Sequence, residues 1–271
     1  LVVRETAVGF NLSVLPQTPP IVLIIILVVL SATTARSGIE VIGRLAESSF
    51  VLVLFSVLLT LFLPLNFAHF EYLQPVLARG VLPLLPAVLI PLGLLSEFVA
   101  ANMVIPYLSE PQKAGRTLFF TVLTSGTVIL LFTIIIIAVF NQTAQNLTLP
   151  PFQLARIISI GNFLERIEVI VLAVWTVVAL IKAAFFMWIG MLGPAQLFNL
   201  KGYRELAYPL GIIVIVLAIL SYDNFAAAVS FYTPQVWGVY SVTVEIGIIL
   251  LLSALALLRG KKGNTLRTTE N

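Results

Sequence analysis

Long apolar runs separated by short polar connections dominate the chain. Seven runs are long enough to cross a bilayer, which takes about 20 apolar residues in an α-helix. They lie at about 19–35, 49–65, 81–108, 117–140, 166–193, 207–230 and 239–258. Because hydrocarbon offers no partner for backbone N–H and C=O groups, such runs form helices rather than open strands. The pattern predicts an all-α integral membrane domain over 1–258 and a polar, basic, disordered tail over 259–271.

Composition supports the same class. Hydrophobic residues make up 60% of the 271 residues and charged residues only 10%, and the mean hydropathy is +1.09. A soluble domain would carry roughly 25% charged residues, so a soluble globular protein is excluded. The net charge of +3 and the pI near 9.3 imply no nucleic-acid partner, because a bias of Lys and Arg toward cytoplasmic connections explains them.

Sequence motifs for enzymatic or metal chemistry are missing. The chain has no Cys and a single His, which excludes a disulfide framework and a multi-histidine metal site. It also lacks a Gly-rich phosphate loop, an HExxH pair and a GxSxG nucleophile elbow. We therefore predict a protein that is not an enzyme and that holds no metal or cofactor.

Basic residues in the connections predict the orientation. One set of alternate connections holds Arg36, Arg44, Lys113, Arg116, Lys201, Arg204, Arg259, Lys261, Lys262 and Arg267, and the opposite set holds Arg4, Arg79, Arg156 and Arg166. Cytoplasmic connections carry an excess of Lys and Arg, so ten residues against four assign the first set to the cytoplasm. The chain is predicted to start outside and to have its carboxyl end in the cytoplasm.

A charged stretch, RSGIEVIGRLAE at 36–47, separates the first two apolar runs. Its charged residues recur at i, i+4, i+8 and i+11, and they are Arg36, Glu40, Arg44 and Glu47. This spacing lines them along one side of a helix, where opposite charges form ion pairs. We expect a short cytoplasmic helix that lies on the membrane or caps the bundle. The alternative is a solvated linker whose charges only maintain the orientation.

The third run, at 81–108, carries polar and helix-breaking residues at bilayer depth, where polar groups are costly and mark function. Pro91 and Gly93 favour the end of one half-helix. Ser96 followed by Glu97 suits the start of the next. Broken helices in transporters offer free backbone groups to a buried ligand, so we expect ligand-binding residues here, namely Gly93, Leu94, Ser96, Glu97, Phe98 and Asn102. The alternative is a proline-kinked structural helix in which Glu97 caps its own backbone.

The fifth run has a polar stripe. Glu165, Glu168, Trp175 and Lys182 follow one another at steps of 3, 7 and 7 residues and so share one helix face. Arg166 and both glutamates lie at the outer boundary, where charge is cheap. Lys182 lies deeper, and either it extends toward the cytoplasmic interface or it pairs with a carboxylate inside the bundle.

Three segments carry a resemblance to a known family. They are RETAVGFNLSVLPQTPP (4–20), ARSGIEVIGRLAE (35–47) and GNFLERIEVIVLAVWTVVALIKAAFF (161–186). In this order and spacing they resemble the spore germination permease family, the B subunits of nutrient germinant receptors. That family belongs to the amino acid/polyamine/organocation transporter superfamily. The resemblance extends over the chain to about residue 258.

The resemblance implies a ten-helix, LeuT-like bundle of two inverted five-helix repeats, with the ligand at the broken first and sixth helices. The seven apolar runs align with helices four to ten, so the third run corresponds to the broken sixth helix. A fourth helix would run from outside to inside, as the charge bias predicts. The amino end is then expected to be incomplete, without the first three helices.

The implied function is that of a receptor subunit that senses an amino acid, sugar or nucleoside in the inner membrane of a dormant spore and triggers germination. The expected partners are an A-type membrane subunit and a C-type lipoprotein, and the stretch at 36–47 would brace the bundle or contact the A-type subunit. One alternative is an amino acid/cation secondary transporter with Glu97 or Lys182 as proton carrier. Another is an inactive truncated remnant.

Overall fold

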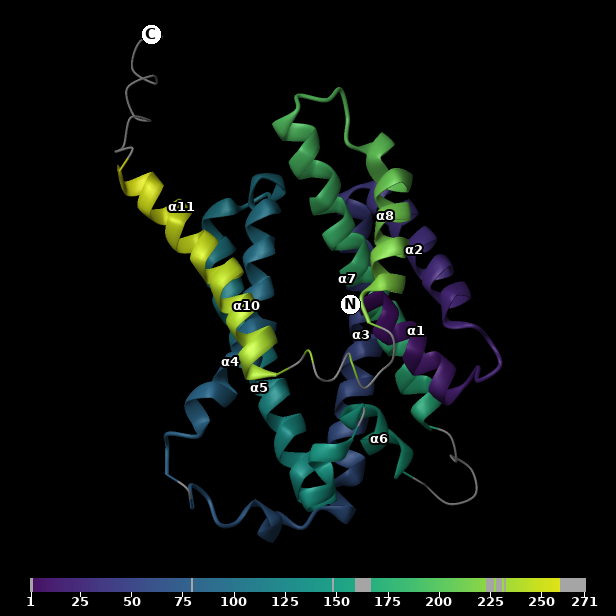
Figure 1. The fold of residues 1–271 in the computed structure, drawn as a ribbon, viewed down its shortest axis with the longest axis vertical. Helices are drawn as coiled ribbons and strands as arrows, with labels where there is room; N and C mark the ends of the chain where they lie inside the picture. Colours follow the sequence, from purple (N-terminus) through teal and green to yellow (C-terminus); the bar gives the residue numbers. More distant parts are fainter. Residues whose placement is uncertain are drawn as a thin grey trace. The chain divides into compact units, whose positions relative to one another are not determined.

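The computed structural model describes residues 2–78, 80–147, 149–158, 167–222, 227, 231 and 233–258. These residues form helices and their connections and include no strand (Figure 1). Glu165, Arg166 and the tail at 259–271 lie outside them, so their predicted roles remain predictions. The chain divides into two compact units, Leu1–Val76 with Thr127–Ala228 and Leu77–Gly126 with Val229–Asn271.

The first unit is a helical bundle built around α7. Its helices are α1 (Val2–Ser13), α2 (Pro20–Ser37), α3 (Ile39–Phe62), α6 (Pro150–Arg156), α7 (Ile167–Leu197) and α8 (Ala207–Leu220). The helices α1, α2, α3, α6 and α8 all pack against α7. Trp188 and Met191 of α7 are buried, together with Ile24 and Val28 of α2. This core fixes the positions of α1, α3 and α7, which carry the site described below.

Local sequence explains how α2 and α3 are joined. Pro20 begins α2, where its fixed φ suits the first turn and its missing N–H costs nothing. Gly38 ends α2 with a φ of 101°, a conformation that favours glycine, and its N–H bonds to the carbonyl of Ala35. The helix α3 then begins at Ile39. A single residue therefore separates the two helices.

The predicted short helix at 36–47 is not a separate element. Arg36 lies in the last turn of α2, whereas Glu40, Arg44 and Glu47 lie at the start of α3, which continues to Phe62. Most residues after Gly38 favour helix formation, no proline interrupts them, and the single Gly43 is tolerated within α3. The charged turns of α3 are thus the end of a membrane-spanning helix.

The second unit pairs α4 (Leu84–Ser96) with the last part of the chain. That part comprises a π-helical turn at Pro234–Gly238, α10 (Val239–Ser241), a second π-helical turn at Val242–Ile246 and α11 (Gly247–Leu258). The helix α4 packs against the segments from Pro234 to Ile246. The unit also holds 3₁₀ turns at Glu97–Met103, Ile105–Tyr107 and Pro111–Lys113 and the first half of α5 (Ala114–Phe140).

The predicted break in the third run takes a different form. The helix α4 continues through Pro91 and Gly93 to Ser96, and the chain then changes from α-helical to 3₁₀ winding at Glu97. Proline at position 91 removes one hydrogen bond without ending the helix. The irregularity is therefore a change of winding on the carboxyl side of Gly93.

Six helical segments are long and apolar enough to cross a membrane within the described residues. They are Pro20–Ser37, Ile39–Phe67, Leu84–Met103, Pro111–Asn146, Glu168–Leu197 and Pro234–Leu255. Of the seven predicted runs, the one at 207–230 is described as a helix only over the 14 residues of α8. The all-α integral membrane fold is confirmed, while the alignment with helices four to ten of a ten-helix bundle remains a prediction.

Candidate functional site

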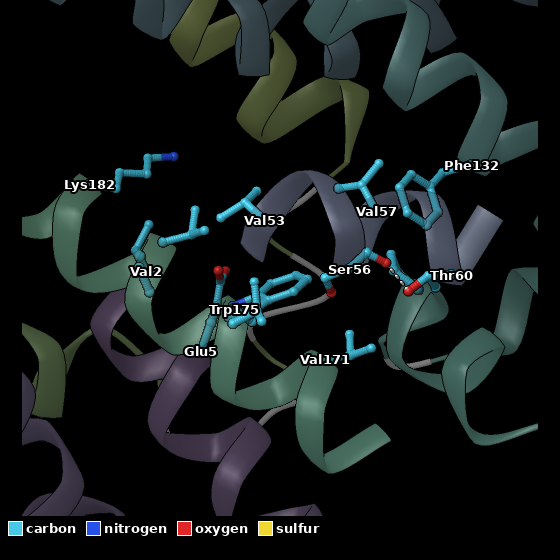
Figure 2. Close-up of a pocket in the computed structure, with 14 residues that line it drawn as sticks. Val2, Glu5, Val53, Ser56, Val57, Thr60, Phe132, Val171, Trp175 and Lys182 are labelled. Atoms are coloured by element: carbon cyan, nitrogen blue, oxygen red, sulfur yellow. Dashed lines mark hydrogen bonds between the residues drawn. The ribbon is translucent and has the colours of Figure 1, made fainter. Parts of the chain in front are cut away.

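A cavity of about 350 Å³ lies within the first unit, mainly between α1, α3 and α7. Figure 2 shows its polar and aromatic lining, to which α1 contributes Glu5, α3 contributes Ser56 and Thr60, and α7 contributes Trp175 and Lys182. The packing of α1 and of α3 against α7 thus builds one site. Its volume is at the lower end of the range for small-molecule sites.

Two opposite charges lie at the cavity. Glu5 is in the first turn of α1, where the positive end of the helix dipole favours a carboxylate. Lys182 is near the middle of α7, on the cavity wall. Both side chains extend from their helices toward the cavity (Figure 2). A charged side chain within a membrane-spanning helix is costly and marks a candidate ligand or ion site, so Lys182 makes this cavity the candidate site of the unit.

Hydroxyl groups of α3 line another part of the wall. Ser56 and Thr60 are one turn apart and are only 7% and 2% exposed. The Thr60 hydroxyl donates to the carbonyl oxygen of Ser56 at 2.8 Å, so its hydrogen is used within α3. Among the described residues, the Ser56 hydroxyl has no hydrogen-bond partner. Ser56 is therefore the hydroxyl of this wall that can donate to a ligand.

Apolar groups complete the cavity. Branched side chains come from α3 and α7, and they are Val53, Val57, Val171, Val174 and Val178. The indole of Trp175 lies beside them and is 39% exposed. Such walls bind aliphatic groups and exclude water. The site thus combines a small apolar chamber with charged groups of both signs.

The predicted ligand-binding residues at 93–102 all lie in the second unit. Gly93 is buried, Leu94 and Asn102 are exposed, and Ser96, Glu97 and Phe98 are half-buried. The Ser96 hydroxyl donates to the carbonyl oxygen of Gly93 at 2.9 Å, within α4. The cavity of the first unit contains none of these residues, and their role in binding remains a proposal.

The two predicted charge stripes have different outcomes. Arg44 and Glu40 form an ion pair at 2.6 Å on the exposed surface of α3. The Arg36 guanidinium lies 5.6 Å from the ring centre of Tyr208 in α8, a cation–π distance. In the second stripe, Glu168 lies in the first turn of α7 and Trp175 and Lys182 reach the cavity. Trp175 and Lys182 thus line the same cavity, while the functional role of the stripe remains a prediction.

Sequence reasoning missed Glu5, Ser56 and Thr60. Glu5 belongs to a 12-residue helix, which is too short to produce a membrane-spanning signal. Ser56 and Thr60 do leave a signal, because they are polar residues at i and i+4 in an otherwise apolar run. Arg4, assigned from the charge bias to an external connection, also lies in this helix.

Metal ligands do not gather in the described part of the chain. No group of three or more His, Cys, Asp or Glu side chains lies close enough there to hold an ion. The residues that can hold a ligand are therefore the charged, hydroxyl and aromatic side chains of the cavity.

Long apolar helices and a cavity of small-molecule size define an all-α integral membrane protein with a candidate solute site. The chain belongs to the spore germination protein family, whose family model matches residues 1–226. It is 29% identical over 221 residues to spore germination protein KB of Bacillus subtilis (strain 168), which covers 78% of this chain and 58% of that protein. It is 24% identical over 260 residues to spore germination protein XB of Bacillus anthracis, covering 94% of this chain and 69% of that protein. No solved structure matches the chain.

Proposed function

We propose that the protein is a membrane subunit of a spore nutrient germinant receptor, which senses a small germinant through a transporter-like site and triggers germination. Membership of the spore germination protein family supports a role in germination. The cavity between α1, α3 and α7 supports a binding role, and it is the observation that carries this proposal. The subunit acts as a receptor rather than an enzyme.

The chemistry of the cavity favours one kind of germinant among amino acids, sugars and nucleosides. The Lys182 ammonium attracts a carboxylate and the Glu5 carboxylate attracts an ammonium group. Valine side chains surround the space between them. A small zwitterion with an aliphatic side chain satisfies all three features, and L-valine is a suitable probe.

The segment at 93–102 is proposed as a second ligand-responsive element. A change from α-helical to 3₁₀ winding weakens the hydrogen bonds of Glu97–Met103 and marks a hinge in many proteins. The residues Gly93, Leu94, Ser96, Glu97, Phe98 and Asn102 would respond to the germinant by contact or by a change of winding. Glu97→Gln removes the charge and preserves the shape, so a lost response would assign a role to the carboxylate.

The proposed location is the inner membrane of the bacterial spore, with the carboxyl end in the cytoplasm. The proposed partners are an A-type membrane subunit and a C-type lipoprotein. The charged start of α3, with the exposed Arg44 and Glu40 pair, is a suitable contact surface because it is polar and accessible.

A secondary transporter is the second candidate function, because Lys182 reaches the cavity and could carry a proton. Counterflow of labelled L-valine in proteoliposomes distinguishes the two. A receptor binds L-valine without counterflow, whereas a transporter exchanges it. If the protein is a receptor, spores that carry Lys182→Met are expected to lose their germination response. Normal germination of these spores with every amino acid, sugar and nucleoside tested would refute the proposed function.

A further inference from the structure

Arg4 connects the first helix to the end of α8. One guanidinium nitrogen, Nη1, donates hydrogen bonds to the carbonyl oxygen of Ala218, at 2.7 Å, and to that of Ile219. The guanidinium carbon also lies 4.7 Å from the ring centre of Tyr222, within cation–π range. Tyr222 is only 8% exposed. Arg4 therefore holds the end of α8 through two hydrogen bonds and a cation–π contact with a buried ring.

The end of α8 requires such a partner. The helix has 14 residues and is about 21 Å long at 1.5 Å per residue, less than the hydrocarbon thickness of about 30 Å. Its last carbonyl groups have no partner within the helix, and its dipole favours a cation at this end. The Arg4 guanidinium supplies both the hydrogen-bond donor for the carbonyl groups and the positive charge for the dipole. The hydroxyl of Ser221 adds a hydrogen bond to the carbonyl oxygen of Ala218 at 3.0 Å.

The neighbouring residue on α1 belongs to the cavity. Glu5 lines the cavity, and Arg4 does not. Consecutive residues of a helix point about 100° apart, so α1 presents one charge to the cavity and the other to α8. Val3, Thr6 and Ala7 are 7%, 1% and 0% exposed, so the part of α1 that carries Arg4 and Glu5 is packed against its neighbours. A movement of Glu5 must therefore move Arg4.

We infer that Arg4 is a positioning residue through which occupancy of the cavity controls the end of α8. The ligand-dependent part of this inference rests on the proposed function. A ligand that binds Glu5 shifts α1, and α1 carries Arg4 away from the carbonyl oxygens of Ala218 and Ile219. Carbonyl groups that lose their partner in apolar surroundings are costly, so the last turn of α8 rearranges. The end of α8 thus differs between the occupied and the empty receptor.

Thiol labelling in the intact protein tests the positioning role without a ligand. The chain contains no cysteine, so Ser221→Cys introduces a single thiol into it at the end of α8. In this background, Arg4→Met is expected to raise the rate of alkylation at least about fivefold, the lower range of site-to-site coupling. Arg4→Lys keeps one charged donor and should raise the rate less. Arg44→Met, which removes an exposed arginine, should leave it unchanged.

The Ser221→Cys protein also tests whether occupancy of the cavity changes the end of α8. L-Valine is expected to change the alkylation rate in the parent protein, and Arg4→Met is expected to abolish this change while the L-valine affinity stays within about threefold, below typical coupling. An unchanged alkylation rate without ligand in Arg4→Met would overturn the inference. So would a large loss of L-valine affinity, because Arg4 would then be part of the binding site. If the ligand-free effect appeared but no germinant bound the parent protein, the proposed function would fail and the positioning role would stand.

Discussion

Gly93 of α4 lies directly against Ser241 of α10, and a methyl group on Gly93 would lie 2.2 Å from the Ser241 hydroxyl oxygen. The contact has a counterpart in the π-helical turn that precedes α10, since a methyl group on Gly238 would lie 2.5 Å from Cβ of Leu89 in α4. Each of the two packed segments thus presents a glycine to a side chain of the other. Small residues at such crossings allow close backbone approach in membrane helices. The sequence favours Gly93 as a helix breaker, but its structural role is close packing.

Gly93→Ala is expected to destabilise the protein by about 1–3 kcal/mol, the usual cost of overpacking. Ser241→Gly in the same protein should recover part of the loss, because it removes the clashing side chain. Thermal unfolding in detergent measures both effects. The matched control is Gly115→Ala in α5, where no atom lies within 4 Å of the added carbon. An equal loss of stability in that control would show that the effect is not due to the crossing.

Lys182→Met is expected to weaken L-valine binding by about 10- to 100-fold, because a hydrogen bond to a charged group contributes about 1.5–3 kcal/mol. Glu5→Gln should have a similar effect on L-valine. Isothermal titration of the purified protein measures the change. Lys201→Met removes an exposed lysine outside the cavity and should bind normally. Valinamide, which lacks the carboxylate, should bind the parent protein and Lys182→Met equally weakly.

Ser56→Ala is expected to reduce L-valine affinity by a factor of about 2 to 10, since a neutral hydrogen bond contributes about 0.5–1.5 kcal/mol. Thr60→Val should change affinity less, because the Thr60 hydroxyl already donates to the carbonyl of Ser56. The two substitutions therefore separate a hydroxyl that serves the ligand from one that serves the helix. A larger loss of L-valine affinity in Thr60→Val than in Ser56→Ala would show that Thr60, and not Ser56, supplies the hydroxyl that bonds to the ligand.

Arg44→Met is expected to change the stability of the subunit by only about 0.3–0.5 kcal/mol, because the Glu40 pair is exposed and joins residues four apart on one helix. Co-purification with the A-type subunit is the informative measurement. A large loss of assembly would identify the start of α3 as a contact surface, since the local ion pair is too weak to explain it. Unchanged assembly would leave the charged residues with a role in orientation alone.

Hydropathy predicted most of the helices because the cost of burying unpaired backbone in lipid exceeds local preferences. A different rule, helical spacing, places Trp175 and Lys182 on one face, and both residues line the cavity. The break expected near Gly93 was displaced to Glu97, because proline and glycine effects on a helix depend on the neighbouring helix that covers them. Here Ser241 and Trp237 lie against Gly93, and no sequence pattern indicates this pairing.

Glu5 illustrates the other limit of prediction. Glu5 forms a candidate site only together with Lys182, which is 177 residues later in the chain. The packing of α1 on α7 brings both residues to one cavity. The charged stretch at 36–47 shows an intermediate case. Its helical spacing indicates ion pairs, and Arg44 does pair with Glu40, but the division of the stretch between α2 and α3 depends on Gly38 within it.

The one-residue connection at Gly38 restricts how the bundle can respond to a ligand. A side chain there would need an unfavourable φ and would lie 3.3 Å from the Tyr203 hydroxyl. The ends of α2 and α3 that meet at Gly38 are therefore held close together. Relative motion of these helices must grow toward their opposite ends, near the 3₁₀ turn at Leu63–Phe67. Motion of α3 in this sense would widen the cavity next to Thr60, which α3 contributes to the wall, while the charged start of α3 stays in place.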